Sequence, residues 1–211
     1  MKIIFLKIVL LVLIMTVSCG DDGTGSEGTV IWPLTVGYRW VGTMNEYDPY
    51  GVLVNSYQYE FHVRNTNTIS NKTWYVLETV ALDDTVTYPQ FLANQDDGIW
   101  AYYFATEKSA SAVSSSLWLE YPATVDDSYL TGADQNITAR VASTDAIVTL
   151  TSGDYSCHVY TMTPQVSFPT VETFYLVPDL GPVKLATYAP GPDDTPYLSR
   201  LWLLDYSGMS Q

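Results

Sequence analysis

A repeated pattern of short alternating segments constrains the fold more than any other feature of this sequence. Residues 56–63 (SYQYEFHV) place polar and apolar side chains by turns, as a strand with one buried face does. Turn signals such as DPYG at 48–51, DDG at 96–98 and PGP at 190–192 separate such segments. Tyr, Val, Thr, Trp and Phe, which suit a pleated surface, are frequent at 72–82, 98–104, 137–142, 146–150, 155–161, 173–177, 183–188 and 198–205. The pattern predicts an all-β fold, an antiparallel strand meander that forms an open or partly closed barrel or sandwich.

One segment lacks this pattern. Residues 105–116 (ATEKSASAVSSS) are small and polar, and we expect a loop or a short helix there.

Two pairs of distant phrases resemble each other. Residues 33–40 (PLTVGYRW) are echoed by 122–129 (PATVDDSY), with proline, threonine, valine and an aromatic residue at the same spacing. Phe91-Leu92 followed by Gly98 is echoed by Tyr175-Leu176 followed by Gly181. We interpret the echoes as a degenerate duplication in which each half supplies one strand meander. Chance similarity between β-rich segments is the alternative, because few positions match.

The N-terminus has the organisation of an export signal. Lys2 and Lys7 precede the apolar run 8–17, which is followed by the small Ser18. The run is too short for a transmembrane helix, which needs roughly 20 apolar residues. Residues 1–18 are therefore predicted to be a signal peptide.

Cys19 directly follows this signal. Its position resembles the lipobox of bacterial lipoproteins, in which the cysteine thiol is acylated after cleavage, although Thr16 and Val17 depart from the preferred residues. We expect a lipid anchor at Cys19, and with it a location in the bacterial cell envelope at the outer membrane, on its periplasmic face or at the cell surface.

The chain after Cys19 divides into a tether and a domain. Residues 19–31 are rich in Gly, Ser and acidic side chains and are predicted to be flexible, with roughly 17–19 Å root-mean-square reach over ten residues. Residues 32–211 are predicted to form a single all-β domain. Once Cys19 carries lipid, Cys157 has no disulfide partner, so the core must stabilise the fold.

The charge excludes two classes of partner. Without the signal the chain has seven basic and twenty-three acidic side chains, a net charge of −16. Nucleic acid is excluded because few cations are available to neutralise phosphates. Electrostatic adhesion to anionic headgroups is excluded for the same reason.

No catalytic constellation is visible in the sequence. Cys157 and His158 are adjacent in a predicted strand, so their side chains point to opposite faces and cannot form a nucleophilic dyad. His62 sits in another strand, and the Gly-x-Ser-x-Gly and phosphate-loop motifs are absent. We therefore predict a non-enzymatic protein without a cofactor.

Metal sites are not predicted either. Two separated histidines and one cysteine do not make a transition-metal cluster. Calcium prefers oxygen ligands, but the paired aspartates lack the spacing of a calcium loop and suit turns: 83–84, 96–97, 126–127 and 193–194.

The six Trp and seventeen Tyr residues have two readings. They could form a sugar- or lipid-binding surface, but sheets also use such residues in their cores. We predict that Trp40, Trp74 and Trp100 are core anchors.

Four phrases resemble a family of uncharacterised bacterial lipoproteins. These are the start PLxxGxxW at 33–40, DGIW at 97–100, GDYSCHVY at 153–160, and the hairpin at 174–184 (FYLVPDLGPVK) with its Gly-x-Val-Lys ending. The resemblance covers residues 32 to about 206 and implies a fold, but no activity.

We favour a membrane-tethered, non-enzymatic domain with a binding or structural role in the envelope, one that could hold an apolar ligand in a barrel concavity. The alternatives are a surface module that binds a glycan or a protein through exposed aromatic residues, and a hydrolase with converging carboxylates. The residues that line the concavity should distinguish them.

Overall fold

The computed structural model describes residues 29–81, 89–103, 114–167 and 169–209. All regular structure in these residues is β-strand, which confirms the predicted fold class. The strands are β1 Tyr38–Tyr47, β2 Leu53–Ile69, β3 Lys72–Ala81, β4 Gln90–Gln95, β5 Gly98–Tyr103, β6 Ser114–Glu120, β7 Ser128–Thr131, β8 Ile137–Leu150, β9 Gly153–Pro164, β10 Val171–Val177, β11 Gly181–Pro190 and β12 Pro196–Met209.

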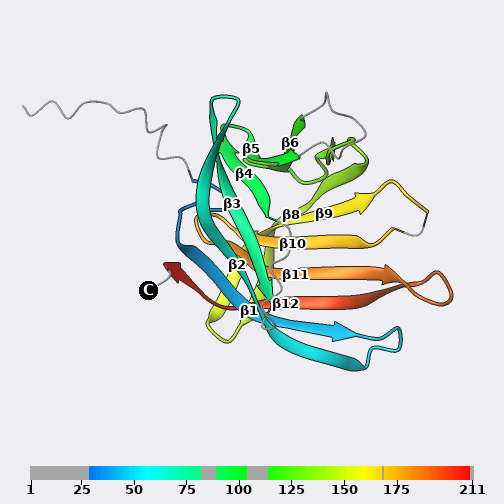
Figure 1. The fold of residues 1–211 in the computed structure, drawn as a ribbon. Coiled ribbons are helices and arrows are strands. Elements are labelled where there is room, and N and C mark those ends of the chain that lie inside the picture. The colour runs from blue at the N-terminus through cyan, green and yellow to red at the C-terminus, as the bar shows by residue number, and fades with distance from the viewer. Residues whose placement is uncertain (1–28, 82–88, 104–113, 168, 210–211) are drawn as a thin grey trace, which may run out of the picture.

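The strands form one antiparallel sheet in the order β6-β5-β4-β3-β2-β1-β12-β11-β10-β9-β8-β7. The sheet curves into a nearly closed barrel (Figure 1). Its first and last strands pair with each other, from Tyr38↔Met209 to Glu46↔Arg200. Among the described strands, each is hydrogen-bonded to the next one in the chain, except that β6 does not pair with β7. The gap in the barrel, which we call the seam, therefore lies in the middle of the chain.

The echoed phrases occupy matching places in two six-stranded halves. Residues 33–40 lead into β1 and residues 122–129 lead into β7, while the second echo falls on the hairpins β4–β5 and β10–β11. Gly37 and Asp126 have similar positive φ angles of 86° and 76°. The Gly37 amide donates to the Val63 carbonyl at 2.7 Å, and the Asp126 amide donates to the Val141 carbonyl at 2.9 Å. The same backbone turn therefore begins each half.

Two sequence-based expectations are corrected. Segments 137–142 and 146–150 form the single strand β8, whose register shifts between Val141 and Ser143 and between Ser143 and Ala146 absorb the polar residues between them. Residues 105–113 of the expected loop or helix lie outside the described residues, but 114–116 belong to β6, because the edge of β5 provides backbone partners such as Tyr102↔Ser115.

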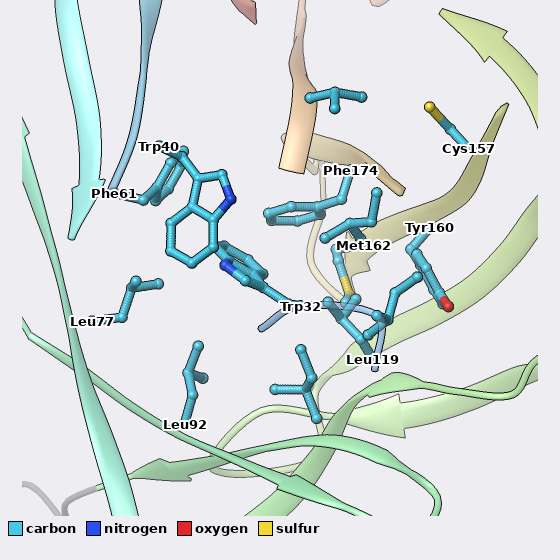
Figure 2. Close-up of a cluster of buried hydrophobic side chains, with 14 of the residues drawn as sticks. Trp32, Trp40, Phe61, Leu77, Leu92, Leu119, Cys157, Tyr160, Met162 and Phe174 are labelled. Atoms are coloured by element: carbon cyan, nitrogen blue, oxygen red, sulfur yellow. The ribbon is translucent and has the colours of Figure 1, made fainter. Parts of the chain in front are cut away.

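The barrel interior is packed around a tryptophan from the N-terminal segment. Trp32 is fully buried, and its ring makes edge contacts with Trp40 at 5.4 Å and Phe61 at 5.7 Å between centroids. Figure 2 shows it surrounded by Leu77, Leu92, Leu119, Phe174 and others. Ile31, next to it in the chain, is also buried.

A second, smaller cluster packs on the other face of the sheet. Trp74 and Val76 of β3 pack there with Phe91 and Ala93, while Leu77 belongs to the interior cluster. Trp40 and Trp74 are buried core residues, as predicted, although Trp74 belongs to this second cluster. Trp100 is only partly buried and packs against the same cluster, so it is not a core anchor.

Side chains bridge the seam where a strand ladder is missing. The Tyr129 hydroxyl of β7 accepts from the Glu120 amide at 2.9 Å and donates to the Trp118 carbonyl at 3.1 Å, both on β6. The hydroxyls of Ser116 and Thr131 lie 3.1 Å apart, also across the seam. These bonds satisfy edge groups that would otherwise be open to another strand. In the described part of the chain, no helix is long and apolar enough to cross a membrane.

Candidate functional site

A cleft of about 670 Å³ lies where the N-terminal segment meets the hairpin end of β4 and β5. The N-terminal segment, β3, the β4–β5 hairpin and the connection from β6 to β7 contribute its walls. Its lining residues are Thr29, Val30, Ile31, Tyr75, Asn94, Gln95, Asp96, Gly98, Tyr121 and Pro122.

Backbone hydrogen bonds between the two halves hold these walls. The Tyr121 amide, directly after β6 in the connection that leads to β7, donates to the Asp97 carbonyl in the β4–β5 turn at 3.0 Å. Val30, before β1, is held by Asp179 of the β10–β11 turn. The Asp179 amide donates to the Val30 carbonyl at 2.7 Å, and the Val30 amide donates to the Asp179 Oδ1 atom at 3.0 Å. The segment before each half is thus clamped to a hairpin of the other half.

Gly98 permits the close approach on one side of the cleft. Its φ is +132°, and a Cβ atom there would lie 2.1 Å from the Leu119 carbonyl oxygen and 2.8 Å from the Tyr121 nitrogen. A larger residue would push the β4–β5 turn away from Tyr121.

Two amide side chains give the cleft hydrogen-bonding capacity. The Asn94 Nδ2 atom donates to the Trp32 carbonyl at 3.2 Å, which leaves the Asn94 carbonyl oxygen as an acceptor. The Gln95 Oε1 atom accepts from the Lys72 ammonium at 3.3 Å. Because an ammonium only donates, this contact fixes the orientation of the Gln95 amide. The Gln95 Nε2 donor is buried and has no partner among the described residues.

Two tyrosines complete the lining. Burial, with a smaller contribution from the charge of Asp179, raises the pKa of Tyr121, so its hydroxyl stays protonated and can donate. Its ring also contacts the His158 imidazole, with centroids 5.3 Å apart. Tyr75 lines the cleft from β3.

The surroundings of the cleft are acidic. Asp96 is the one carboxylate in the lining, and Asp97 and Glu120 are next to lining residues in the chain. Burial, together with the charges of Asp127 and Asp97, raises the pKa of Glu120. These carboxylates would repel an anionic ligand at the rim of the cleft.

A smaller and more apolar hollow of about 250 Å³ lies at the opposite ends of β4 and β5. Its lining residues are Pro89, Gln90, Phe91, Ala101, Tyr102, Tyr103, Trp118 and Ala133.

The residues considered from the sequence do not converge in a reactive site. Cys19 lies outside the described residues. His62 is buried in β2, with its Nδ1 atom 3.8 Å from a Glu60 oxygen. Cys157 is buried, and burial raises the pKa of its thiol to about 11, which leaves it protonated at neutral pH.

The paired aspartates also remain apart. Of these pairs, 96–97, 126–127 and 193–194 lie in turns or connections, whereas 83–84 lies outside the described residues. No group of three or more potential metal ligands gathers in the part of the chain that the structure describes.

Sequence reasoning missed the cleft residues. One signal was present, because Tyr121 precedes Pro122 as Trp32 precedes Pro33 in the echoed phrase. Gln95 had no comparable signal.

Comparisons with known proteins give no function. No protein-family model matches the chain, and no curated protein matches it. Two crystal structures are similar in fold. One is described only as a candidate exported protein with a YmcC-like fold from Bacteroides fragilis. It is 11% identical, with a TM-score of 0.49, and the match covers 86% of this chain and 100% of that one.

The other is described as a candidate lipoprotein from Parabacteroides distasonis. It is 14% identical, with a TM-score of 0.46, and the match covers 85% of this chain and 99% of that one. At these scores neither structure assigns a role to any residue of this chain.

Proposed function

We propose that this protein is a lipid-anchored, non-enzymatic domain of the bacterial envelope whose cleft binds an uncharged glycan. The observation that carries the proposal is that Gln95, whose buried Nε2 donor has no partner among the described residues, lines the same cleft as Tyr75 and Tyr121. An unpaired buried donor costs about 1–3 kcal/mol, and a turn of the Gln95 amide toward a ligand hydroxyl in the cleft would remove that cost. Tyrosine rings and side-chain amides are groups that suit a polyhydroxylated ligand.

The packing of the barrel favours this proposal over an apolar ligand in the interior. Trp32 and its neighbours occupy the centre, and the Trp32 indole is fully buried. An apolar ligand there would have to displace Trp32, at a cost of several kcal/mol. The smaller hollow at the other end of β4 is the remaining place for an apolar ligand.

The acidic residues give little support to a hydrolase. Hydrolysis of a glycosidic bond by the usual route needs two carboxyl groups that flank the substrate. Asp96 alone lines the cleft, and the Glu120 side chain is not part of the lining. We therefore propose binding without turnover.

The anchor is proposed from the sequence. Cys19 follows an export signal, and the acidic residues after it suit a tether. Radiolabelled palmitate should label the wild-type chain and not a Cys19→Ala variant. Equal labelling of both would show that Cys19 is not the anchor.

A glycan array tests the binding site directly. Purified residues 20–211 should bind at least one uncharged glycan, and Gln95→Leu should weaken that binding by about 10-fold or more, as expected for a lost hydrogen bond at a buried site. Gln58→Leu on the exposed face of β2 is the matched control and should bind like the wild type. Thermal unfolding would check that both variants fold. The proposal fails if no glycan binds, or if folded Gln95→Leu binds as tightly as the control.

A further inference from the structure

The last residues of the predicted tether, 29–31, form one wall of the cleft. Thr29 and Ile31 line the cleft, and between them Val30 is pinned by its two hydrogen bonds to Asp179. In Figure 1 the N-terminal segment joins the barrel on the side where the C-terminus also lies, whereas the tips of the β1–β2 and β11–β12 hairpins lie on the other side. The cleft and the attachment point of the tether are therefore the same part of the molecule.

Chain length limits the distance between this cleft and a membrane. Ten peptide links separate Cys19 from Thr29, and they span at most about 33–36 Å when fully extended. A flexible chain of that length has a root-mean-square reach of about 17–19 Å. Because Thr29 lines the cleft, the limit holds however the barrel tilts. No such limit applies to the β1–β2 hairpin, since β2 alone has 17 residues, or about 55 Å of strand.

We infer that the cleft faces the membrane that holds the Cys19 lipid, and that its ligand is a saccharide carried by a lipid of that same membrane. The inference rests on the proposed glycan-binding function and on the anchor. The acidic groups near the cleft, Asp96, Asp97 and Glu120, favour an uncharged saccharide over a phosphorylated headgroup.

Confinement on one surface makes such a ligand easy to capture. A short tether gives two groups on the same surface an effective concentration in the millimolar range. A cleft with few hydrogen-bonding groups could then be filled by a saccharide that binds only weakly from solution.

The test separates presentation in the same membrane from binding in general. The array glycan with the strongest signal is coupled to phosphatidylethanolamine, and the lipidated full chain is placed in phosphatidylcholine vesicles. The readout is binding of the same glycan in free, fluorescent form. Glycolipid in the protein's own vesicle should lower this binding 10-fold or more, while glycolipid in separate vesicles should neither lower it nor cluster the vesicles.

Two variants control the geometry. Forty Gly and Ser residues inserted between Gly28 and Thr29 should allow clustering with separate glycolipid vesicles, because the cleft can then leave its own surface. Gln95→Leu should lose the fluorescent glycan in every arrangement.

Free fluorescent glycan that binds equally well with and without glycolipid in the same vesicle would overturn the inference and leave the proposed function intact. Clustering of separate vesicles by the unmodified chain would also overturn it. Absence of any binding to the free glycan would instead overturn the proposed function.

Discussion

The two halves of the barrel, β1–β6 and β7–β12, have the same strand order but are joined differently at β1–β12 and at β6–β7. A shift of six strands around the sheet superimposes the strand order of one half on that of the other. Gly98 and Gly181 are equivalent in this arrangement. A Cβ atom on Gly98 would meet the Tyr121 backbone, and one on Gly181 would lie 2.9 Å from the Trp32 ring. Gly98 of the first half therefore packs against the segment that leads into the second half. Gly181, its equivalent in the second half, packs against the segment that leads into the first half.

The difference lies in the residue that each segment delivers. Trp32 goes into the interior and is fully buried, whereas Tyr121 is half-buried and lines the cleft. The strands next to these segments differ in the same way. β1 pairs along its length with β12, but its counterpart β7 meets β6 only through side chains. One junction is closed by a strand ladder and a buried ring, and the other borders the open cleft.

Truncation of the two equivalent aromatics should give the largest contrast. Trp32→Ala should lower the free energy of unfolding by about 3–5 kcal/mol, because it leaves a large cavity in the interior. Tyr121→Ala should cost about 1–2 kcal/mol, as a half-buried side chain does. Urea denaturation measures both values. Equal losses would mean that the two junctions contribute equally to the free energy of unfolding.

The equivalent glycines should differ less. Gly98→Ala should destabilise the fold by about 3 kcal/mol, because positive φ and a contact with backbone act together. Gly181→Ala should cost somewhat less, about 2 kcal/mol, because its nearest contacts, with the Trp32 and Trp40 side chains at 2.9 Å, are longer than the 2.1 Å contact at Gly98. Urea denaturation measures both changes in the free energy of unfolding. A larger loss for Gly181→Ala than for Gly98→Ala would contradict the prediction.

The seam offers a third contrast. Tyr129→Phe should cost about 1–2 kcal/mol, because the Glu120 amide and the Trp118 carbonyl lose their partner. Amide exchange at Glu120 should accelerate. Tyr38→Phe is the matched control at the β1–β12 pairing, where the hydroxyl is 3.5 Å from Ser207 and the strand ladder is intact, so little change is expected. An unchanged Glu120 exchange rate in Tyr129→Phe would show that this hydroxyl does not hold the seam.

The smallest effect is expected at the turn position with positive φ, which is Gly37 in one half and Asp126 in the other. Asp126→Gly gains backbone freedom at a positive φ and loses an exposed ion pair with Arg140, so stability should stay within about 0.5 kcal/mol of wild type. Asp126→Val should cost about 1–2 kcal/mol, because a branched residue tolerates this φ poorly. Thermal unfolding distinguishes the two variants. An Asp126→Val variant as stable as the wild type would show that the fold does not require a positive φ at this position.

Alternation and turn residues were enough to predict the fold class and most strands. They failed where pairing, not local pattern, decides the structure. Ser114–Ser116 are strand because β5 lies beside them, and β8 continues through 143–145 because its partner β9 allows bulges. The burial of Trp74 was predictable, but the face it packs on was not, because that face depends on register.

The cleft was beyond prediction for a related reason. Its walls come from residues 29–31, 94–98 and 121–122, and nothing local in these segments shows that they meet. The echo at Pro33 and Pro122 placed their neighbours in equivalent positions, and only the fold shows that Trp32 turns inward and Tyr121 stays in the cleft.

The pairing of β1 with β12 has a consequence for the time at which the protein can fold. β1 lacks its second strand neighbour until β12, which begins at Pro196, has been synthesised. Contacts so distant in sequence slow folding and leave the β1 edge open to wrong partners meanwhile. A barrel whose gap lies at β6–β7 and whose longest-range pairing joins β1 to β12 therefore depends on remaining unaggregated until β12 has been made.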